Sequence, residues 1–588
     1  MSKQNTTSKQ LRPEHPRPQF VRESWLSLNG IWSFALDPGQ SGEERDMPKG
    51  QGFDSEITVP FCPESKLSGI ELTDFIPSCW YAVYINIPEE WVGNRTLLHF
   101  GAVDYESTLW LNGNKVGTHR GGYSSFTMDI TDFLKDGENL LVLRANDNTR
   151  DPLIPSGKQS DKYDSYGCFY TRTTGIWQTV WLESVPQTYL KTVKYYTDIT
   201  NNKVNIQAQI AGDTSDCDLT CIIKDNGKEI TRTTIKAAAN VSMDISIPDA
   251  VLWEPGKPYL YDVEFILSCE GADFDRVSSY FGMREVKIEG YKVLINGKSV
   301  FQRLVLDQGF YPDGIYTAPT DRDLKKDIEM SLTAGFNGAR LHEKVFEERF
   351  LYWCDKLGYL VWGEFPNWGL SLNIPGALDR MTREWVEVME RDFNHPAIIG
   401  WCPFNETTND QDPEILRTVY RLTKTLDTTR PVIDTSGYFH VETDIYDVHD
   451  YEQNPEVLKS HHDSMLTDDS KAWKNFPEPW NRNASYQGKI PYFVSEYGGI
   501  WWNPNQKDEK SWGYGNRPSS EEDFITRYIE LTKVLLNHPK MFGFCYTQLY
   551  DVEQEVNGLY TYDRKMKISA KSLARIKEIN QTKAAIED

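Results

Sequence analysis

The sequence lacks three features that would place it in common functional classes. It contains no apolar run of the roughly 20 residues that a membrane-spanning helix needs. Positive charge is scarce: 63 Lys and Arg stand against 86 Asp and Glu, and a net charge of -23 would repel nucleic acid and anionic membranes. It has neither a Gly-rich dinucleotide motif after a strand nor a Cys-x-x-Cys metal spacing. We therefore expect no nucleic acid, membrane, cofactor or metal as a partner.

The nine cysteines are scattered along the chain, and several lie inside apolar runs. An odd number without regular spacing argues against a disulfide framework. We expect buried free thiols instead, because free cysteine is among the most buried residue types. The cysteines within apolar runs are Cys79, Cys354, Cys402 and Cys545.

The chain starts with polar residues 1–5, and no apolar segment follows them. An intact signal peptide would need such a segment, so the sequence favours a cytoplasmic location. A periplasmic or secreted location stays open for a chain whose leader was removed. The oligomeric state also stays open, and a homo-oligomer is compatible with the sequence.

Aromatic residues are abundant, with 18 Trp, 31 Tyr and 26 Phe. Strands and β-sandwich cores favour aromatic residues and explain part of this excess. Flat aromatic faces are also common in sugar-binding sites. The composition therefore favours a neutral or locally recognised ligand, such as a carbohydrate.

Three stretches of the chain have different patterns, as expected for 588 residues at about 150 residues per domain. Residues 1–186 contain short alternating strands, including a hairpin whose Asn112-Gly113 pair suits a type I′ turn. They predict a jelly-roll β-sandwich that binds sugar. Residues 187–284 predict a second, immunoglobulin-like β-sandwich. Residues 285–588 alternate strands with helices.

The alternating part predicts a (β/α)8 TIM barrel, because eight strands fit into about 300 residues. The predicted strands are residues 301–306, 335–341, 359–363, 398–404, 431–434, 445–449, 492–495 and 542–546. The predicted helices are residues 323–333, 346–356, 378–393, 413–426, 455–473 and 519–536.

Two of these strands end in glutamate, and strand ends form the active site of such a barrel. Glu406 follows the fourth strand and Glu496 ends the seventh. Hydrolysis of a glycosidic bond needs one carboxyl group as proton donor and a second carboxylate. Burial beside Trp401 and Phe404 favours Glu406 as acid/base, and hydrogen bonds from Tyr451 and Arg340 would keep a nucleophilic Glu496 ionised. The residues alone support this order only slightly better than its reverse.

Other polar and aromatic residues at the strand ends are candidate substrate contacts. Each has a plainer explanation: Arg340 equally well forms a salt bridge at the barrel mouth, and Trp501 with Trp502 forms either a sugar platform or a loop anchor. The candidates are Asn405, Tyr451, Arg340, His342, Glu343, Trp368, His449, Trp501, Trp502, Gln548 and Asn557.

Several stretches together resemble glycoside hydrolase family 2, which includes β-galactosidases, β-glucuronidases and β-mannosidases. The resemblance rests on residues 174–183, 336–340, 392–401, 405–406 and 495–498. It implies retaining hydrolysis of a terminal β-linked sugar. It also implies that Glu406 is the acid/base and Glu496 the nucleophile, that Asn405 binds the 2-hydroxyl, and that Tyr451 and Arg340 support the nucleophile.

The sequence departs from the family pattern where the sugar is recognised. β-Glucuronidases carry an Asn-x-Lys motif, and residues 555–559 contain no Lys, whereas Asn557-Gly558-Leu559 looks more like a β-galactosidase. An acidic residue of the first domain is replaced by Phe169. Trp368-Gly369-Leu370 stands where large β-galactosidases bind magnesium, which implies a metal-independent enzyme.

We therefore expect an exo-acting β-glycosidase with a preference for β-galactosides. A β-glucuronidase or β-galacturonidase is the alternative, because Lys344 and Arg517 could bind a carboxylate. A non-catalytic carbohydrate-binding protein is less favoured, because Asn405, Glu406 and Glu496 are all present.

Overall fold

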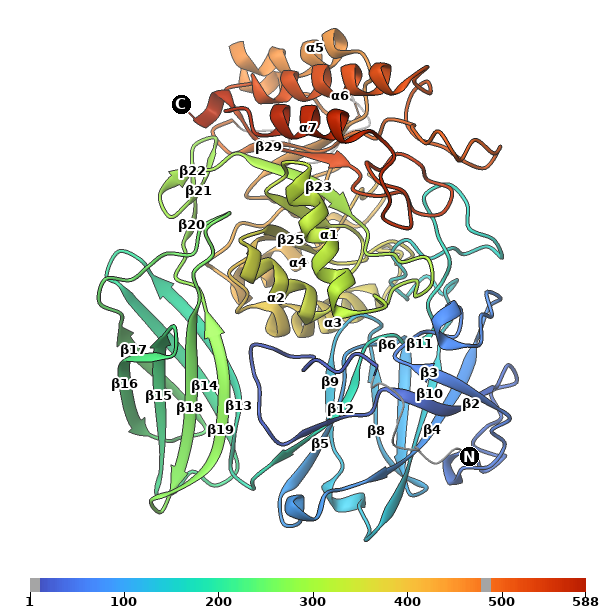
Figure 1. Cartoon of the computed structure of the whole chain (residues 1–588), viewed down its shortest axis with the longest axis vertical. Helices are drawn as coiled ribbons and strands as arrows, with labels where there is room; N and C mark the ends of the chain where they lie inside the picture. Colours follow the sequence, from blue (N-terminus) through green and yellow to red (C-terminus); the bar gives the residue numbers. More distant parts are fainter. Residues whose placement is uncertain (1–10, 477–487, 588) are drawn as a thin grey trace.

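The computed structural model describes residues 11–476 and 488–587, and Figure 1 shows two β-sandwiches lying side by side below a barrel. The first sandwich packs a four-stranded sheet on a six-stranded sheet, with Trp32, Phe34 and Tyr81 in its core. In sheet order, the strands are β1 (Trp25–Ser27), β12 (Val180–Val185), β5 (Arg95–Phe100) and β9 (Phe126–Asp129), then β3 (Ser55–Val59), β2 (Gly30–Leu36), β4 (Ser78–Asn86), β10 (Glu138–Asn146), β7 (Glu106–Leu111) and β8 (Asn114–Arg120); β6 (Val103–Asp104) pairs with β11 (Gly175–Ile176).

The hairpin predicted at Asn112-Gly113 is confirmed. It joins β7 to β8, and both turn residues have positive φ angles, 54° for Asn112 and 81° for Gly113. A type I′ turn needs this left-handed conformation at both central positions, which Asn and Gly adopt most easily.

The second sandwich consists of a three-stranded and a four-stranded antiparallel sheet. Buried and exposed residues alternate along strands such as β14, as a half-buried strand requires. In sheet order, the strands are β13 (Tyr189–Asp198), β14 (Lys203–Ala211) and β17 (Asn240–Ser246), then β16 (Lys228–Lys236), β15 (Cys217–Asp225), β18 (Tyr261–Cys269) and β19 (Ala272–Phe281).

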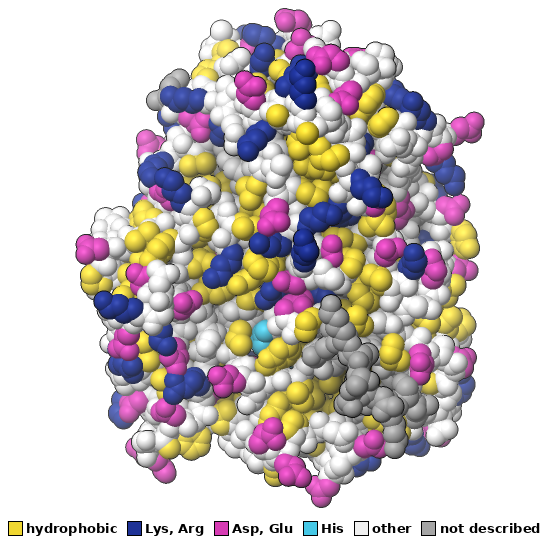
Figure 2. All heavy atoms as spheres, viewed as in Figure 1, with side chains coloured by type: hydrophobic (Ala, Val, Ile, Leu, Met, Phe, Trp, Pro, Cys, Tyr) yellow, Lys and Arg dark blue, Asp and Glu magenta, His cyan; other side chains and the backbone are white. Residues whose placement is uncertain are grey.

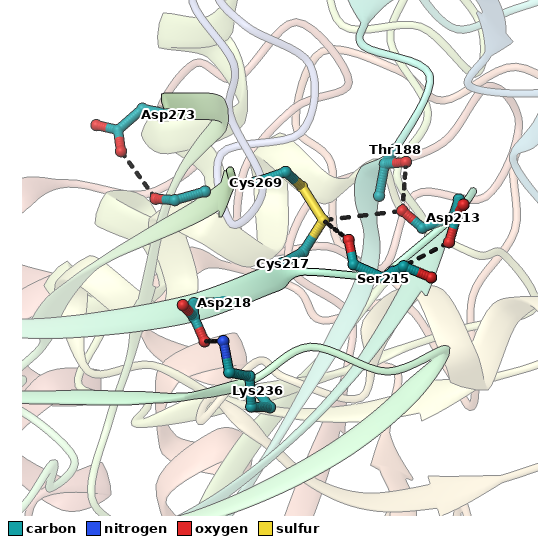
Figure 3. Close-up of a disulfide and its surroundings, with 9 residues drawn as sticks. Thr188, Asp213, Ser215, Cys217, Asp218, Lys236, Cys269 and Asp273 are labelled. Carbon is teal, nitrogen blue, oxygen red and sulfur yellow. Dashed lines mark hydrogen bonds and ion pairs between the residues drawn. A yellow bond between two sulfur atoms is a disulfide. The ribbon is translucent and has the colours of Figure 1, made fainter. Parts of the chain in front are cut away.

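The expectation of free thiols is wrong for two cysteines. Cys217 and Cys269 are directly opposite each other on β15 and β18 and form a disulfide (Figure 3). The sequence does not reveal this pair, because only the pairing of the two strands brings them together. The expectation holds for Cys79, Cys354, Cys402 and Cys545, which are buried and free.

The barrel is built around a seven-stranded parallel sheet, and a small sheet of β20 (Val286–Glu289), β21 (Lys292–Ile295) and β22 (Lys298–Ser299) precedes it. Its strands carry almost continuous buried residues, as expected for parallel strands covered by helices. In sheet order they are β26 (Ile398–Cys402), β25 (Leu360–Glu364), β24 (Gly338–Leu341), β23 (Gln302–Asp307), β29 (Met541–Thr547), β28 (Tyr492–Gly498) and β27 (Tyr446–Asp450).

The predicted fifth strand, residues 431–434, is reduced to isolated bridges beside β26, at Val432 and Ser436. The reason is that side chains occupy its backbone donors. The N–H of Val432 donates to Asp444 Oδ2 (2.9 Å) and that of Asp434 to Thr443 Oγ1 (3.3 Å). These groups are therefore not available for a second neighbouring strand.

All six predicted helices are present, and a seventh was missed. The prediction of residues 455–473 is too long, because α5 ends at Thr467 and the Asp468 side chain caps the 3-10 turn of residues 469–471. No helix among residues 11–476 and 488–587 has both the length and the apolar character needed to cross a bilayer. The helices are α1 (Asp321–Thr333), α2 (Glu348–Leu357), α3 (Ala377–Asp392), α4 (Pro413–Leu426), α5 (Pro455–Thr467), α6 (Glu521–Leu536) and the missed α7 (Ala570–Asn580).

On the face shown in Figure 2, acidic and basic side chains lie intermingled. The absence of a nucleic-acid partner stays a prediction from the net charge.

Candidate active site

Glu406 and Glu496 meet at the mouth of the barrel, both beside the same ring nitrogen of His449. His449 Nδ1 lies 2.7 Å from Glu406 Oε1 and 3.4 Å from Glu496 Oε2. One oxygen of each carboxyl group and the ring nitrogen all lie within 4.8 Å of one another. The ends of β26, β27 and β28 thus bring together three side chains that are far apart in the sequence.

Glu496 is buried and surrounded by donors. Arg340 donates to its Oε1 from 3.1 Å, and the Tyr451 hydroxyl donates to its Oε2. Burial alone would raise the pKa of Glu496, but the charges of His449 and Arg340 and the hydrogen bond from Tyr451 lower it to about 2. Glu496 is therefore an ionised carboxylate at neutral pH.

Arg340 links three parts of the site. Besides Glu496, it donates to Glu364 Oε1 (2.6 Å) and to Asn405 Oδ1 (3.2 Å), and its side chain is 1% exposed. Burial raises the pKa of Glu364 to about 7, although Arg340 opposes this. Arg340 is thus both a salt-bridge residue of the barrel mouth and a direct contact of Glu496.

Only one of the two polar atoms of the Asn405 side chain is hydrogen-bonded within the described chain. Asn367 Oδ1 accepts from its backbone N–H (2.7 Å), and the Trp368 indole donates to its carbonyl oxygen (3.2 Å). Its Oδ1 is bonded to Arg340, whereas its buried Nδ2 has no partner in the described chain. A buried donor without a partner costs about 1–3 kcal/mol and is in place for a ligand.

Glu406, the next residue, has a φ angle of 49°, in the left-handed region that non-glycine residues rarely adopt. Its backbone N–H donates to the Ser436 carbonyl oxygen (2.9 Å), in the segment that replaces the fifth strand. Strained conformations of this kind concentrate at functional sites. They turn a side chain away from the direction of the regular strand.

The pKa values of His342 and His449 are shifted in opposite directions. Burial lowers the pKa of His342, whose Nδ1 lies 3.4 Å from Glu364 Oε2, so this ring is neutral. Burial also disfavours the charged form of His449, but Glu496 and Glu406 outweigh it and raise its pKa. The two carboxyl groups thus favour the protonated form of His449.

Gln548 and Asn557 belong to a hydrogen-bonded chain on another wall of the mouth. Gln548 Nε2 donates to Asn557 Oδ1 (2.9 Å), and Asn557 Nδ2 donates to Glu555 Oε1 (2.8 Å). The hydroxyl of Tyr170, from the first sandwich, donates to the other oxygen of Glu555. Tyr170 and Glu555 were not predicted, because no periodic pattern marks residues on loops.

Glu343 and Trp368 lie together beside Asn405. Glu343 is fully buried, and its Oε2 accepts from the Trp368 backbone N–H (3.2 Å). Burial raises the pKa of this carboxyl group.

Trp501 and Trp502 lie on the loop after β28, and among the described residues neither of them is hydrogen-bonded to Glu406 or Glu496. Arg517 covers the ring of Trp501, 4.4 Å from its centroid, and Trp502 stacks on Phe524 of α6. Both contacts fit the role of a loop anchor, and the sugar platform stays a prediction.

Among the described residues, Glu406, His449 and Glu496 are also the one group close enough to hold a metal ion. Arg340 and Tyr451 already bond to Glu496, and an arginine so close disfavours a cation there. The metal-independent site stays a prediction.

The comparisons with known proteins follow the three parts of the chain. Residues 50–186 match the family model "Glycosyl hydrolases family 2, sugar binding domain", residues 188–284 match "Glycosyl hydrolases family 2", and residues 286–581 match "Glycosyl hydrolases family 2, TIM barrel domain". These matches cover the first sandwich from β3 onward, the second sandwich and nearly the whole barrel.

Curated relatives carry two different names. A β-galactosidase of Thermoanaerobacter pseudethanolicus is 27% identical over 410 residues, which cover 66% of this chain and 53% of that protein. A β-glucuronidase of Rattus norvegicus is 27% identical over 458 residues, which cover 70% of this chain and 68% of that protein. The chain thus spans about half the length of the bacterial relative.

Among solved structures, a β-glucuronidase from Ruminococcus gnavus in complex with D-glucuronic acid aligns with a TM-score of 0.78. The alignment covers 97% of this chain and 100% of that one at 20% sequence identity, so the likeness concerns the fold. Together with the three family models in their chain order, it leads to one conclusion: the chain belongs to glycosyl hydrolase family 2.

Proposed function

We propose that the protein is a retaining exo-β-glycosidase that hydrolyses terminal β-linked sugars. The observation that carries this proposal is the pair Glu406 and Glu496, with oxygens within 4.8 Å of each other and of His449. Retaining glycosidases place their two carboxyl groups about 5–5.5 Å apart, whereas inverting ones need a wider gap for a water molecule. The presence of Asn405, Glu406 and Glu496 together also speaks against a non-catalytic binding protein.

The reaction proceeds in two steps. Glu496 attacks the anomeric carbon while Glu406 gives its proton to the departing oxygen, which forms a glycosyl-enzyme ester and releases the aglycone. Glu406 then takes a proton from water, and the water oxygen displaces Glu496. Arg340 and Tyr451 hold Glu496 in its charged form before attack and receive it again as a leaving group.

Asn405 has the group needed to recognise a hydroxyl next to the anomeric carbon. Its Oδ1 is held by Arg340, which fixes the amide plane and leaves Nδ2 as a free donor. We propose that Nδ2 binds the 2-hydroxyl of the sugar. Such a bond strengthens as charge develops in the transition state.

For the identity of the sugar, we infer a β-galactoside from the resemblance of Asn557-Gly558-Leu559 to β-galactosidases. Relatives named β-galactosidase and β-glucuronidase are both similar to the chain. The carboxylate partners suggested by the sequence do not support a uronide. Lys344 donates to the carbonyl oxygens of Gly309 and Tyr316, and Arg517 covers Trp501. One other cation, Lys158, lies over the indole of Trp368 with Nζ 3.6 Å from the ring centroid, and it favours β-glucuronides or β-galacturonides as the second candidate.

A panel of nitrophenyl β-glycosides, assayed with wild type, Glu406→Gln and Glu496→Gln, tests the proposal. We expect turnover by wild type and a loss of about 10⁴-fold or more in Glu496→Gln, which removes the nucleophile. Glu406→Gln should lose about 10²–10⁴-fold, the usual contribution of general acid–base catalysis. Wild-type turnover no faster than that of the two variants contradicts the proposal.

A further inference from the structure

A cavity of about 410 Å³ lies where the second sandwich meets the barrel. One wall is the outer face of the sheet β13-β14-β17, a second wall is the end of α3, and residues 17–20 close a third side. Helix α3 leads into the start of β26, whereas Glu406 follows the other end of that strand. The cavity is therefore separate from the candidate active site.

The sheet wall presents two rows of polar side chains, one residue from each of the three strands in each row. Residues two apart on a strand point to the same face, so both rows face the cavity. The amides of Gln207, Gln209 and Asn240 are exposed, and none of them is hydrogen-bonded to another described residue. In strand order, the rows are Thr192, Gln209 and Asn240, then Lys194, Gln207 and Ser242.

The barrel wall contains a buried guanidinium group with one nitrogen that is not bonded. Arg391 donates from Nε to Asp392 Oδ1 (2.6 Å) and from Nη2 to the Phe346 carbonyl oxygen (2.7 Å). Its side chain is 4% exposed, and its buried Nη1 has no partner in the described chain. A buried donor without a partner is costly, so an oxygen atom brought by a ligand would be stabilising here.

Hydrogen bonds at Asn394 hold the three sides of the cavity together. Its Nδ2 donates to the Val193 carbonyl oxygen (2.8 Å), and its Oδ1 accepts from the Tyr195 N–H (3.0 Å). Gln19 donates to the Asn394 carbonyl oxygen (3.1 Å). The cavity is thus formed before any ligand arrives, which lowers the cost of ordering on binding.

The charges around the cavity balance. Three cationic and two acidic side chains line it, and one of the cations, Arg391, is paired with the further carboxylate of Asp392. A wall without net charge and with several amides favours an uncharged ligand that carries many hydroxyl groups, because each amide offers both a donor and an acceptor. The volume falls within the range of about 300–1,000 Å³ that is usual for small-molecule sites.

We propose that this cavity is a second carbohydrate-binding site, which holds a neutral sugar unit of a longer carbohydrate away from the catalytic pair. A carbohydrate anchored there would keep its chain ends at a raised effective concentration near the barrel. The inference goes beyond the proposed glycosidase function, because binding in the cavity requires no turnover.

The test counts bound disaccharides by native mass spectrometry in the Glu496→Gln background, where the probes are galactobiose, cellobiose and xylobiose. Adding Gln209→Ala and Asn240→Ala removes two amides that lie opposite each other on β14 and β17. For at least one probe, this double change should weaken binding at one site per chain about tenfold to thirtyfold, as expected for two lost hydrogen bonds.

Asn201→Ala in the same background is the matched control, because Asn201 is an exposed amide between β13 and β14 that does not line the cavity. It should leave the number of bound disaccharides unchanged. The inference is wrong if the double change leaves the binding of all three probes unaltered, or if Asn201→Ala causes an equal loss.

Failure of this inference and failure of the proposed function give different results. If wild type cleaves no nitrophenyl glycoside but the double change still removes one bound disaccharide, the proposed function fails and the second site stands. In the otherwise wild-type chain, Gln209→Ala with Asn240→Ala should leave kcat/KM on nitrophenyl glycosides and the Tm unchanged. A parallel loss of activity or of Tm would mean that the two amides act on the active site or on stability, and the second site would be refuted.

Discussion

The two sandwiches serve the barrel in different ways. The first reaches into the active site, where Tyr170 bonds to Glu555 and Lys158 lies over Trp368. The second contacts the barrel away from the mouth: Asn394 donates to the Val193 carbonyl oxygen (2.8 Å), and Trp253 donates to that of Asp355 (2.8 Å). Both contacts lie before β26 or at the end of α2, away from the ends of the strands that carry the glutamates.

This difference teaches that similar β-folds in one chain can contribute chemistry or stability. Changes at the first interface should alter kcat/KM, and changes among the buried residues of the second sandwich should alter only the free energy of unfolding. The following four predictions test this division, from the largest expected effect to the smallest.

Arg22 joins the two sandwiches. It pairs with Glu183 of β12 at 3.1 Å and with Asp275 of β19 at 2.7 Å, and all three side chains are buried. Arg22→Met would leave Glu183 with only the His99 ring and Asp275 with only the Leu190 N–H as partners, and removing the charge between two buried carboxylates costs about 3–5 kcal/mol of stability. Thermal unfolding should show a lower Tm, while kcat/KM at 25 °C stays within about twofold. If Arg22→Met keeps a normal Tm but loses activity, the proposed division of roles between the two sandwiches is wrong.

The Cys217–Cys269 disulfide acts within the second sandwich, where it closes a sequence separation of 52 residues. The double variant Cys217→Ser/Cys269→Ser should lose about 2–4 kcal/mol, because the unfolded chain regains conformational entropy. Denaturant unfolding under oxidising conditions measures this loss, and wild type in reducing agent should match the variant. Activity of the folded variant should be unchanged.

Gly157 lets the first sandwich approach the barrel. A Cβ at this position would lie 2.5 Å from the Glu343 carbonyl oxygen, so Gly157→Ala has to move the loop that carries Lys158. We expect kcat/KM to fall about 100-fold, the effect of a 1 Å misplacement in an active site. Gly167→Ala is the matched control: its φ of +50° is similar to the +54° of Gly157, but nothing lies within 4 Å of its Cβ. Equal effects of the two changes would show that backbone strain is the cause.

Tyr451 tests the support that the barrel itself gives to Glu496. Tyr451→Phe removes one hydrogen bond to the charged form of Glu496, so kcat/KM at neutral pH should fall about tenfold. The pKa of Glu496 is lowered to about 2, so its carboxylate is lost only as pH falls through that value. Without Tyr451 the charged form is less stable and the pKa rises, which moves the acidic limb of the kcat/KM profile to higher pH. An unchanged acidic limb would mean that His449 and Arg340 alone are enough to keep Glu496 ionised.

Much of the barrel could be predicted from local patterns. Helix α4 begins and ends at the predicted residues, and β26 and β28 were found from their apolar runs. The predicted fifth strand is not formed in full, because Asp444 and Thr443, nine to twelve residues away, accept hydrogen bonds from its backbone N–H groups. Helix α7 was missed, although Ser569 caps it through Ser572 N–H.

The sequence by itself determined the family resemblance and the two candidate glutamates. The physical reason is that apolar runs define the strands, and parallel strands in a barrel converge at their carboxyl ends. Glu406, Glu496, Tyr451 and Arg340 could therefore be proposed as neighbours before any contact was known.

Only the tertiary structure decided which other groups surround that pair. Lys158 reaches Trp368 from a loop of another domain, and Arg22 lies between two sandwiches. Cys217 meets Cys269 only because β15 pairs with β18. Contacts of this kind leave no periodic signal, because they depend on how folded domains pack.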